Sequence, residues 1–202
     1  MGSGRQGLSE QDVDPDPLAQ FGRWFSEARD AGVFEPEAVA LATAAADGSP
    51  SARMVLLKGF DERGFRFFTN YDSRKGRELA ENPRAALLFH WKELGRQVRI
   101  EGGVERLPAA ESAEYFATRS RESRLSALAS PQSRVIGSRE ELDRRLRELA
   151  GAGEPAAPAH WGGFRLVPRV YELWQHREHR LHDRLRYRRD PAGEWVLERL
   201  AP

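Results

Sequence analysis

Four short segments of the sequence carry side chains that could bind an anionic ligand. The first is Ser73-Arg74-Lys75, in which Ser73 can cap a helix whose first turn contains the two cations. Two cations at this end oppose the helix dipole, whereas a bound anion would contact both of them and the free backbone N–H groups. The segment is therefore a candidate phosphate site, with two solvated surface cations as the alternative.

The second segment, residues 53–58, reads RMVLLK and is an apolar strand between two cations. On a regular strand Arg53 and Lys58 point to opposite faces, because successive side chains alternate. The alternative for this segment is an ordinary strand with polar ends.

The third candidate is the set Tyr115, Arg119 and Ser123, spaced four residues apart. On a continuous helix these side chains share one face. Two hydroxyls and a guanidinium together form a donor set suited to a phosphate or a carboxylate. A helix break near Ser120 would change this geometry, and a solvated helix face is the alternative.

The fourth segment, residues 174–184, reads WQHREHRLHDR. Interpreted as a strand, it places Arg180, His182 and Arg184 on one face. That face is cationic and contains one group that titrates near neutral pH.

Other common kinds of site are not indicated. His176, His179 and His182 could suggest a metal site, but strand alternation turns His179 away from the other two and no carboxylate completes the set. Asp183 follows His182 without a G-x-S-x-G nucleophile segment. Because GxGxxG and GxxxxGK[ST] are missing, phosphates must be held by side chains and helix N-termini. The lack of cysteine excludes disulfides, cysteine-ligated metals and thiol catalysis.

Composition narrows the class of protein. The chain has 202 residues, of which 40% are hydrophobic, enough for a core and too many for a disordered chain. With 32 Lys+Arg against 31 Asp+Glu the net charge is +1, so no nucleic-acid partner is expected. Positive charge is instead local, which favours a highly anionic small ligand or two phosphorylated ligands. No apolar run approaches the roughly 20 residues of a membrane span, and residues 1–15 lack the apolar region of a secretory signal. We therefore expect a cytoplasmic protein with no membrane partner.

The elements that must position these residues alternate unevenly between strands and helices. Residues 1–16 are expected to be a flexible N-terminal segment, and residues 17–202 a single domain. Several strands follow one another through short turns, which disfavours a doubly wound parallel sheet and favours a mostly antiparallel barrel with peripheral helices. Strands are predicted over residues 38–45, 51–60, 65–70, 85–91, 97–106, 163–174, 180–188 and 195–200, and helices over 17–31, 73–81, 109–128 (in two pieces) and 138–150.

The sequence closely resembles the pyridoxine/pyridoxamine 5′-phosphate oxidases, flavin enzymes of the split-barrel FMN-binding superfamily. The matching segments run in order over about nine-tenths of the chain. They are DPDPLAQF (14–21), RMVLLKGFDERGFRFFTNYDSRKGREL (53–79), NPRAALLFHW (82–91), RQVRIEG (96–102), YFATRSRES (115–123), SPQS (130–133), HWGGFRLVP (160–168) and the C-terminal ELWQ…RLHDRLRYRR…W…RLAP (172–202).

The resemblance implies a mostly β (α+β) fold with peripheral helices, an antiparallel split β-barrel that binds FMN. It also implies three sets of site residues. FMN contacts would fall on Arg53, Met54, Val55, Leu56, Leu57, Lys58, Phe68, Thr69, Arg74, Lys75, Gln97, Gln132, Ser133, Trp174 and Arg184. Substrate-phosphate contacts would fall on Lys58, Tyr115, Arg119 and Ser123. The catalytic contacts near the pyridine ring and the reacting carbon would fall on Arg180 and His182.

The activity implied by the resemblance is oxidation of pyridoxamine or pyridoxine 5′-phosphate to pyridoxal 5′-phosphate. Hydride passes from the C4′ carbon to the flavin, and dioxygen takes up the electrons to give hydrogen peroxide. Enzymes of this kind are homodimers with FMN at the subunit interface. A shared site would explain how Arg53 and Lys58 can both take part although a regular strand points them apart.

Two departures from the family pattern keep other functions open. His176-Arg177 stands where the family commonly has a glycine after the Trp-Gln pair, and no tyrosine precedes Tyr71 to form the family's N-terminal lid. A related flavin oxidase of the phenazine-pathway type is one alternative, although Tyr115, Arg119 and Ser123 argue for a phosphorylated substrate. A non-catalytic protein that binds FMN or pyridoxal phosphate is the other.

Overall fold

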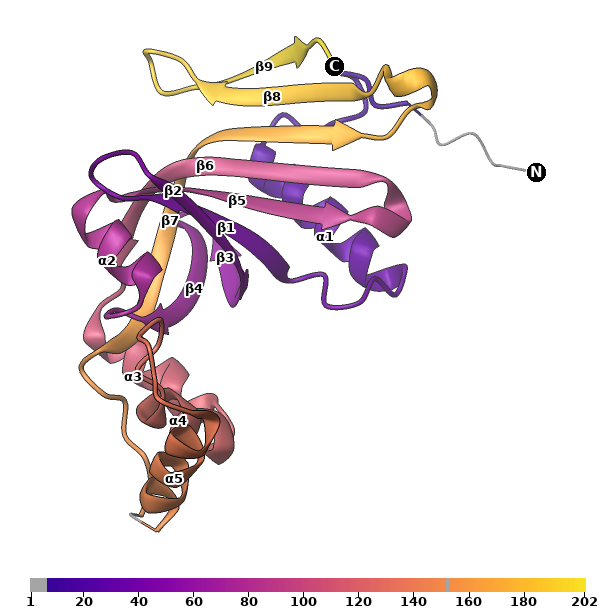
Figure 1. Cartoon of the computed structure of the whole chain (residues 1–202). Coiled ribbons are helices and arrows are strands. Elements are labelled where there is room, and N and C mark those ends of the chain that lie inside the picture. The colour runs from indigo at the N-terminus through magenta and orange to yellow at the C-terminus, as the bar shows by residue number, and fades with distance from the viewer. Residues whose placement is uncertain (1–6, 152) are drawn as a thin grey trace.

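The computed structural model describes residues 7–151 and 153–202, which form a curled antiparallel sheet with helices around it (Figure 1). This confirms the fold class expected from the sequence. The strands are β1 (Ala38–Ala44), β2 (Pro50–Leu56), β3 (Gly59–Asp61), β4 (Gly64–Asn70), β5 (Arg84–Trp91), β6 (Arg96–Arg106), β7 (Trp161–Gln175), β8 (Asp183–Arg189) and β9 (Trp195–Leu200). The helices are α1 (Pro17–Asp30), α2 (Arg74–Glu81), α3 (Ala109–Thr118), α4 (Arg121–Ala129) and α5 (Arg139–Ala150), with short 3₁₀ turns η1 (Lys92–Leu94) and η2 (Glu178–Arg180).

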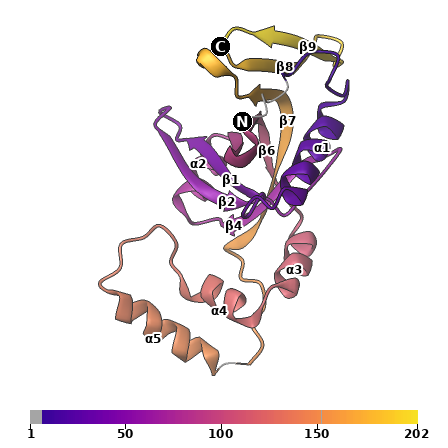
Figure 2. The same cartoon turned by 90° about the vertical axis from the view of Figure 1, so that its right-hand side faces the viewer.

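The sheet branches at its longest strand, β7. Every pairing among the described strands is antiparallel, in the order β2-β1-β5-β6-β7-β4-β3. One edge of β7 pairs with β6, whereas the other edge pairs with β4 over residues 161–166 and with β8 over residues 170–175. Consequently β7 runs from the helical arm α3–α5 at one end of the molecule to the β8–β9 hairpin at the other, as Figures 1 and 2 show.

Helix α1 supplies much of the core. Asp16 caps it, accepting a hydrogen bond from the N–H of Leu18, and proline occupies its first position. Phe21 is fully buried, with its ring centroid about 5 Å from those of Phe60, Phe65 and Phe89. This aromatic cluster packs α1 against the sheet.

The structure interrupts both the strand predicted over residues 51–60 and the strand interpretation of residues 174–184. The strand expected over residues 51–60 is divided into β2, which pairs with β1 up to Leu56, and β3, which pairs with β4 from Gly59. Between them the N–H of Lys58 donates to the carbonyl of Arg66 (2.8 Å). The strand interpretation of residues 174–184 is wrong. There the chain leaves the sheet after Gln175, forms η2, and rejoins at Asp183.

The cause of the second interruption is local backbone geometry. His179 and Arg180 have φ angles of 56° and 63°, in the left-handed region that a strand does not contain. The alternation of faces expected for Arg180, His182 and Arg184 therefore does not apply. Arg180 lies on an exposed turn, whereas Arg184 lies within β8.

The expected break of the third candidate helix is confirmed. Helix α3 ends at Thr118, and Ser120 caps α4, accepting a hydrogen bond from the N–H of Ser123 (3.2 Å). Tyr115 and Ser123 therefore lie on different helices, with Arg119 in the junction between them.

The N-terminal stretch is held against the C-terminal hairpin from Gly7 onward, and residues 1–6 lie outside the described residues. Leu8 and Val13 are buried in the core. The N–H of Leu8 donates to Oδ2 of Asp183 (3.0 Å), and the hydroxyl of Tyr187 donates to the carbonyl of Asp14 (2.6 Å). In the part of the chain that is described, no helix has the length and apolar character to cross a membrane.

Candidate functional site

A cleft of about 440 Å³ lies where β2, β4 and the helices α2–α4 meet. It is lined by many of the residues singled out in the sequence, among them Met54, Val55, Leu56, Lys58, Phe68, Thr69, Lys75, Tyr115, Arg119 and Gln132. The sheet thus brings together members of the first three candidate segments, which are separated by up to 65 residues in the chain, from Met54 to Arg119.

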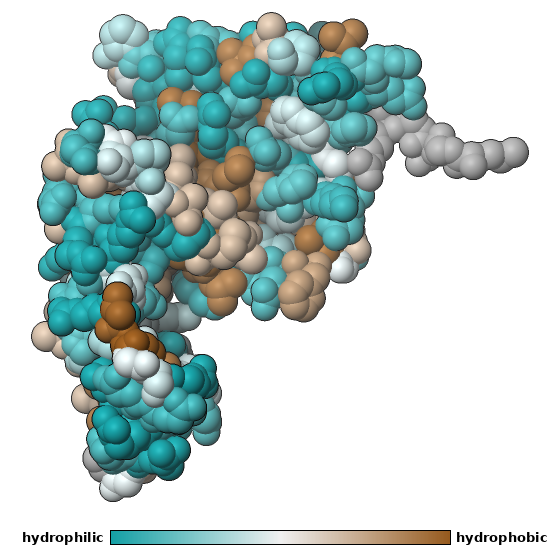
Figure 3. Space-filling view, in the orientation of Figure 1, coloured by the Kyte–Doolittle hydropathy of each residue, from teal (hydrophilic) through white to brown (hydrophobic). Residues whose placement is uncertain are grey.

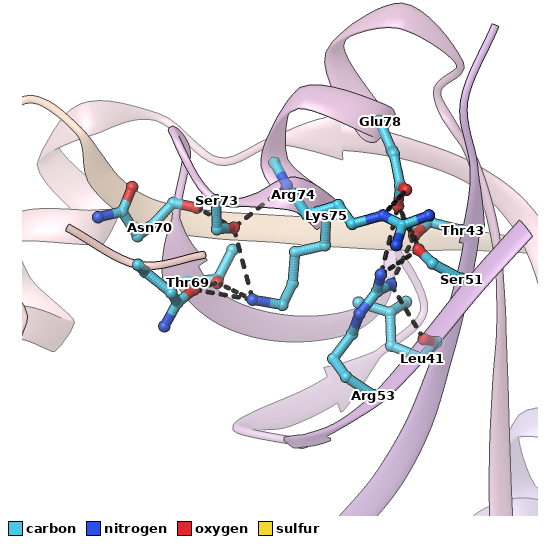
Figure 4. Close-up of polar contacts among 12 residues, drawn as sticks. Leu41, Thr43, Ser51, Arg53, Thr69, Asn70, Ser73, Arg74, Lys75 and Glu78 are labelled. Atoms are coloured by element: carbon cyan, nitrogen blue, oxygen red, sulfur yellow. Dashed lines mark hydrogen bonds and ion pairs between the residues drawn. The ribbon is translucent and has the colours of Figure 1, made fainter. Parts of the chain in front are cut away.

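Lys75 forms the polar floor of this cleft. The predicted cap of α2 is present, since Ser73 accepts a hydrogen bond from the N–H of Gly76 (3.3 Å). This places Lys75 in the first turn, 8% exposed, where Nζ donates to Oγ1 of Thr69 (3.0 Å) and to Oε1 of Gln132 (2.8 Å) (Figure 4). Burial, aided by the charge of Arg53, lowers the pKa of Lys75 to about 8. The ammonium is therefore solvated by neutral oxygens alone and forms no ion pair among the residues described.

A second polar cluster lies beside Lys75 and is organised by Glu78, which is 5% exposed. Its Oε2 accepts from the hydroxyls of Thr43 (2.5 Å) and Ser51 (2.6 Å) and pairs with Nη2 of Arg53 (3.3 Å). Its Oε1 accepts from Nε of Arg74 (2.8 Å). Although burial opposes ionisation, these donors outweigh it and hold the pKa of Glu78 at about 2. Glu78 is therefore a carboxylate at any working pH.

An aromatic wall closes the other side of the cleft. The ring of Phe68 stacks on Tyr115 with centroids 3.9 Å apart, and on Trp161 at 5.5 Å. The guanidinium of Arg119 lies over the ring of Trp161 at 5.0 Å, and its buried Nη1 has no hydrogen-bond partner among the described residues. Burial lowers the pKa of Arg119 and raises that of the Tyr115 hydroxyl. The wall thus contains a cation with one donor that the described residues leave unused.

Some predicted residues near the cleft do not line it. Leu57 points into the core, and the hydroxyl of Ser123 lies 3.0 Å from that of Ser120 rather than facing the cavity. Ser133 follows Gln132 on an exposed loop with a φ of 70°. Arg53 and Arg74 belong to the Glu78 cluster, next to the lining.

The remaining predicted residues form a second group at the far end of β7. Neighbouring strands align Gln97, Trp174 and Arg184 side by side. The guanidinium of Arg184 pairs with the buried carboxylate of Glu172 (2.9 Å), and the ring of His182 lies 4.6 Å from that of Trp174. The sequence-predicted residues are therefore not one cluster within a single chain.

A backbone contact defines how His182 presents its ring. Its Nδ1 accepts a hydrogen bond from the N–H of Arg177 (3.1 Å), so the neutral ring carries its proton on Nε2. Arg180 is exposed on the same turn. No grouping of three or more potential metal ligands occurs within residues 7–151 and 153–202.

Sequence reasoning missed several residues of the cleft and its support. Trp161 lies within a segment that matches the family but was not singled out, and Asn70, Ser126 and Ser130 also line the cavity. The spacing of Arg74 and Glu78, four residues apart on a helix, is a signal for their ion pair. No local signal connects Glu78 with Thr43 and Ser51, because those contacts exist only after the sheet has formed.

Comparisons with known families and proteins cover almost the whole chain. Residues 25–151 match the family described as Pyridoxamine 5′-phosphate oxidase, and residues 161–202 match the Pyridoxine 5′-phosphate oxidase C-terminal dimerisation region. The chain is 59% identical to the pyridoxine/pyridoxamine 5′-phosphate oxidase of Salinibacter ruber, over 98% of this chain and 94% of the relative. It is 58% identical to that of Cupriavidus necator, over 96% and 93%.

Two solved structures are similar in fold. PhzG from Burkholderia lata 383, in complex with tetrahydrophenazine-1-carboxylic acid, has a TM-score of 0.92 and 37% identity, with all of both chains covered. A pyridoxamine 5′-phosphate oxidase-related, FMN binding protein from Nostoc punctiforme has a TM-score of 0.74 and 19% identity, over 94% of this chain and 100% of that one. At that identity the second likeness concerns the fold alone.

Proposed function

The chain belongs to the pyridoxamine 5′-phosphate oxidase family, and on that premise we propose that it is the FMN-dependent oxidase that forms pyridoxal 5′-phosphate. Its substrates are pyridoxamine 5′-phosphate and pyridoxine 5′-phosphate, and dioxygen is reduced to hydrogen peroxide. Relatives that carry this name share about 58% of their residues with the chain over nearly its full length.

The observation that carries the proposal is the buried ammonium of Lys75. A charge removed from water is costly unless an opposite charge compensates it. Among the described residues, the ammonium of Lys75 has only neutral oxygens within hydrogen-bond distance, and the Glu78 carboxylate acts on it only from farther away. Lys75 also lies at the N-terminus of α2, where backbone N–H groups favour an anion. A phosphate monoester supplies the missing negative charge. The residues present therefore fit FMN, with Arg74, Lys75, Thr69 and Gln132 around its phosphate.

The phosphate of the substrate is assigned to the aromatic wall. Arg119 offers its unpartnered Nη1, and the hydroxyl of Tyr115 lies on the preceding helical turn. Lys58 adds an exposed cation at the rim of the same cleft. Ser123 remains part of this assignment from the family resemblance, through a shift of its hydroxyl away from Ser120.

The protein forms a homodimer, in keeping with its dimerisation region, and we place FMN at the interface between subunits. Trp174 lies thirteen residues beyond Trp161 in the same strand, a span of up to roughly 40 Å at about 3.3 Å per residue. The group at the far end of β7 therefore reaches a cleft most directly in a partner subunit. Exposed Met54 and Leu56 lie on the edge strand β2 and suit such a contact. Figure 3 shows an apolar area across the middle of this face of the molecule.

In this scheme, the chain's own residues bind FMN and the substrate and orient the substrate ring. When bound, FMN would supply the redox chemistry of the reaction. Arg119 and Lys58 neutralise the substrate phosphate and so fix the position of its ring. Arg180 and His182 of the second group contact the ring near the reacting carbon, with Nε2–H of His182 as the donor. The stacked rings of Phe68, Tyr115 and Trp161 exclude water from one side of the cleft.

A turnover assay tests the proposal. Purified protein reconstituted with FMN should release hydrogen peroxide and pyridoxal 5′-phosphate from pyridoxamine 5′-phosphate, and flavin released by heat should chromatograph as FMN. Absence of turnover with bound FMN would instead support a non-catalytic binding protein.

The similarity to PhzG supports one alternative function. A carboxylate on a phenazine-type ring could also pair with Arg119, so the charge of the wall does not by itself choose between the substrates. The same assay with a tetrahydrophenazine carboxylic acid decides this. We expect the phosphorylated substrate to be favoured in kcat/KM, and a preference for the phenazine ring would contradict the assignment.

A further inference from the structure

The proposed function does not explain the role of the Glu78 cluster. This cluster consists of Thr43, Ser51, Arg53, Arg74 and Glu78. A buried carboxylate beside a site for a phosphate repels that phosphate. If charge alone mattered, this position would be better filled by a neutral residue. The geometry of the cluster indicates what the carboxylate contributes instead.

The two oxygens of Glu78 have different tasks. Oε2 accepts from the hydroxyls of Thr43 and Ser51, and both hydroxyls in turn accept from the Nη groups of Arg53. Because each hydroxyl has one proton and donates it to Glu78, its lone pairs are left for Arg53. Nη1 of Arg53 also donates to the carbonyl of Leu41 (3.2 Å). Arg53 is therefore held from both Nη groups and contributes its charge from a fixed position.

Oε1 of Glu78 holds the other arginine. It accepts only from Nε of Arg74, whose Nη groups have no hydrogen-bond partner among the described residues. Arg74 is 58% exposed in its side chain and lies in the first turn of α2 next to Lys75. Because the carboxylate binds Nε, both Nη groups of Arg74 remain unused within the described chain. A guanidinium can bind a phosphate through two parallel hydrogen bonds from such groups.

We propose that Glu78 is a positioning residue of the cofactor-phosphate site, which fixes Arg53 and orients the free Nη fork of Arg74 toward the phosphate of FMN without touching the ligand. This inference rests on the proposed function, because that function assigns the phosphate to this end of the cleft. The stabilisation comes from side-chain order that is established before binding, so that less rotamer entropy is lost when the phosphate arrives.

The substitution Glu78→Gln separates positioning from charge. An amide has one acceptor oxygen, and three donors at Oε2 compete for it against one at Oε1. The NH₂ group then faces Nε of Arg74, a donor against a donor, and Arg74 is released. Positioning therefore predicts weaker FMN binding, whereas removal of a repelling charge predicts tighter binding. The two explanations differ in sign.

Riboflavin, which lacks the phosphate, provides the internal reference. Full-length protein stripped of flavin is titrated with FMN and with riboflavin, and flavin fluorescence gives both Kd values. For Glu78→Gln we expect the Kd of FMN to rise roughly tenfold, the cost of ordering one or two mobile side chains, and that of riboflavin to stay within about twofold. Combining Glu78→Gln with Arg74→Ala should add little to the loss caused by Arg74→Ala alone.

Glu111 provides a matched control, since it bridges Arg66 (3.3 Å) and Arg165 (3.5 Å) at a distance from α2. Glu111→Gln should leave the ratio of the two Kd values unchanged. If Glu78→Gln does not fold, Glu78→Asp carries the same test, because it keeps the charge and withdraws it by one methylene. Tighter or unchanged FMN binding, or equal losses for both flavins, would overturn the inference. A wild-type protein that binds both flavins equally would instead refute the phosphate assignment on which the proposed function depends.

Discussion

At the scale of single residues, the cleft is defined by two cations that form no ion pair within the described part of the chain. Lys75 is buried among neutral oxygens, and Arg119 lies over Trp161 with one unpartnered nitrogen. Most other buried or half-buried arginines have carboxylate partners, as Arg165 has in Glu105 and Glu111. The difference marks the two positions at which anionic ligands are expected.

Arg119→Ala should impair substrate binding and leave the cofactor in place. Loss of one partner of a desolvated charge pair costs about 2–4 kcal/mol, which should appear in kcat/KM for pyridoxamine 5′-phosphate. FMN content, measured by absorbance, should match the wild type. Arg124→Ala is the control, because Arg124 pairs with Glu154 outside the cleft. Parallel losses of FMN and activity in Arg119→Ala would show that Arg119 binds FMN and not the substrate phosphate.

FMN affinity should depend on pH through Lys75. Its pKa of about 8 in the free protein is lowered by burial, and a bound phosphate raises it again by opposing that cost. Binding therefore takes up a proton above pH 8, and affinity should fall by up to tenfold per pH unit between the free and bound pKa values. Titrations from pH 7 to 10 measure this, with riboflavin as the reference. A riboflavin curve that falls in parallel would contradict the role of Lys75.

At the scale of elements, helix α2 is positioned by an unusually close approach. A Cβ atom at Gly76 would lie 2.1 Å from the backbone carbonyl oxygen of Tyr71, so only glycine allows the helix to start there. The same turn carries Arg74 and Lys75. Packing of α2 against the end of β4 and the geometry of the phosphate site therefore depend on one another.

Gly76→Ala should reduce both stability and FMN binding. The added methyl group must displace backbone, which costs about 1–3 kcal/mol in the free energy of unfolding. Urea denaturation measures the change, and FMN titration should show a weaker Kd. In Gly103→Ala, by contrast, the new Cβ meets nothing closer than the carbonyl of Pro83 at 4.0 Å, and its stability should change by less than about 1 kcal/mol. Equal stabilities for the two variants would contradict this account of α2.

At the scale of the whole molecule, the length of β7 is the reason why the proposed site needs residues from two subunits. Its first residues pair with β4 beside the cleft, and its last residues pair with β8 beside Trp174 and His182. Because a strand does not fold back on itself, the proposed function assigns the second group to the cleft of a partner subunit. A two-fold symmetric dimer satisfies this for both subunits at once, because each contributes the same surface to the other.

Mixed dimers test this arrangement. Arg119→Ala disables the cleft of its own subunit, and Arg180→Ala disables the group that a subunit lends to its partner. After subunit exchange, each heterodimer should contain one site with neither substitution, so an equal mixture should regain roughly a quarter of wild-type activity. The control is each variant exchanged with itself, which should recover none. No recovery in a mixture whose exchange is proven by mass would place both residues in one subunit's site.

Sequence alone determined the features that depend on local chemistry. The Ser73 cap, the break at Ser120 and the antiparallel strands joined by short turns all follow from residue preferences over a few positions, and the structure contains them. The family resemblance, carried by motifs over nine-tenths of the chain, indicated the flavin and the reaction. The cap, the break and the hairpins were predictable because each depends only on neighbours in sequence.

Tertiary structure decided which of the candidate residues meet. The strand predicted over residues 180–188 begins only at Asp183, because positive φ angles at His179 and Arg180 cannot be recognised from residue types that usually avoid them. The contacts of Glu78 with Thr43, Ser51 and Arg53 form only when α2 packs on the sheet. The length of β7 places the two groups of site residues far apart within one chain. Such contacts depend on how distant segments pack, and no pattern along the chain records that packing.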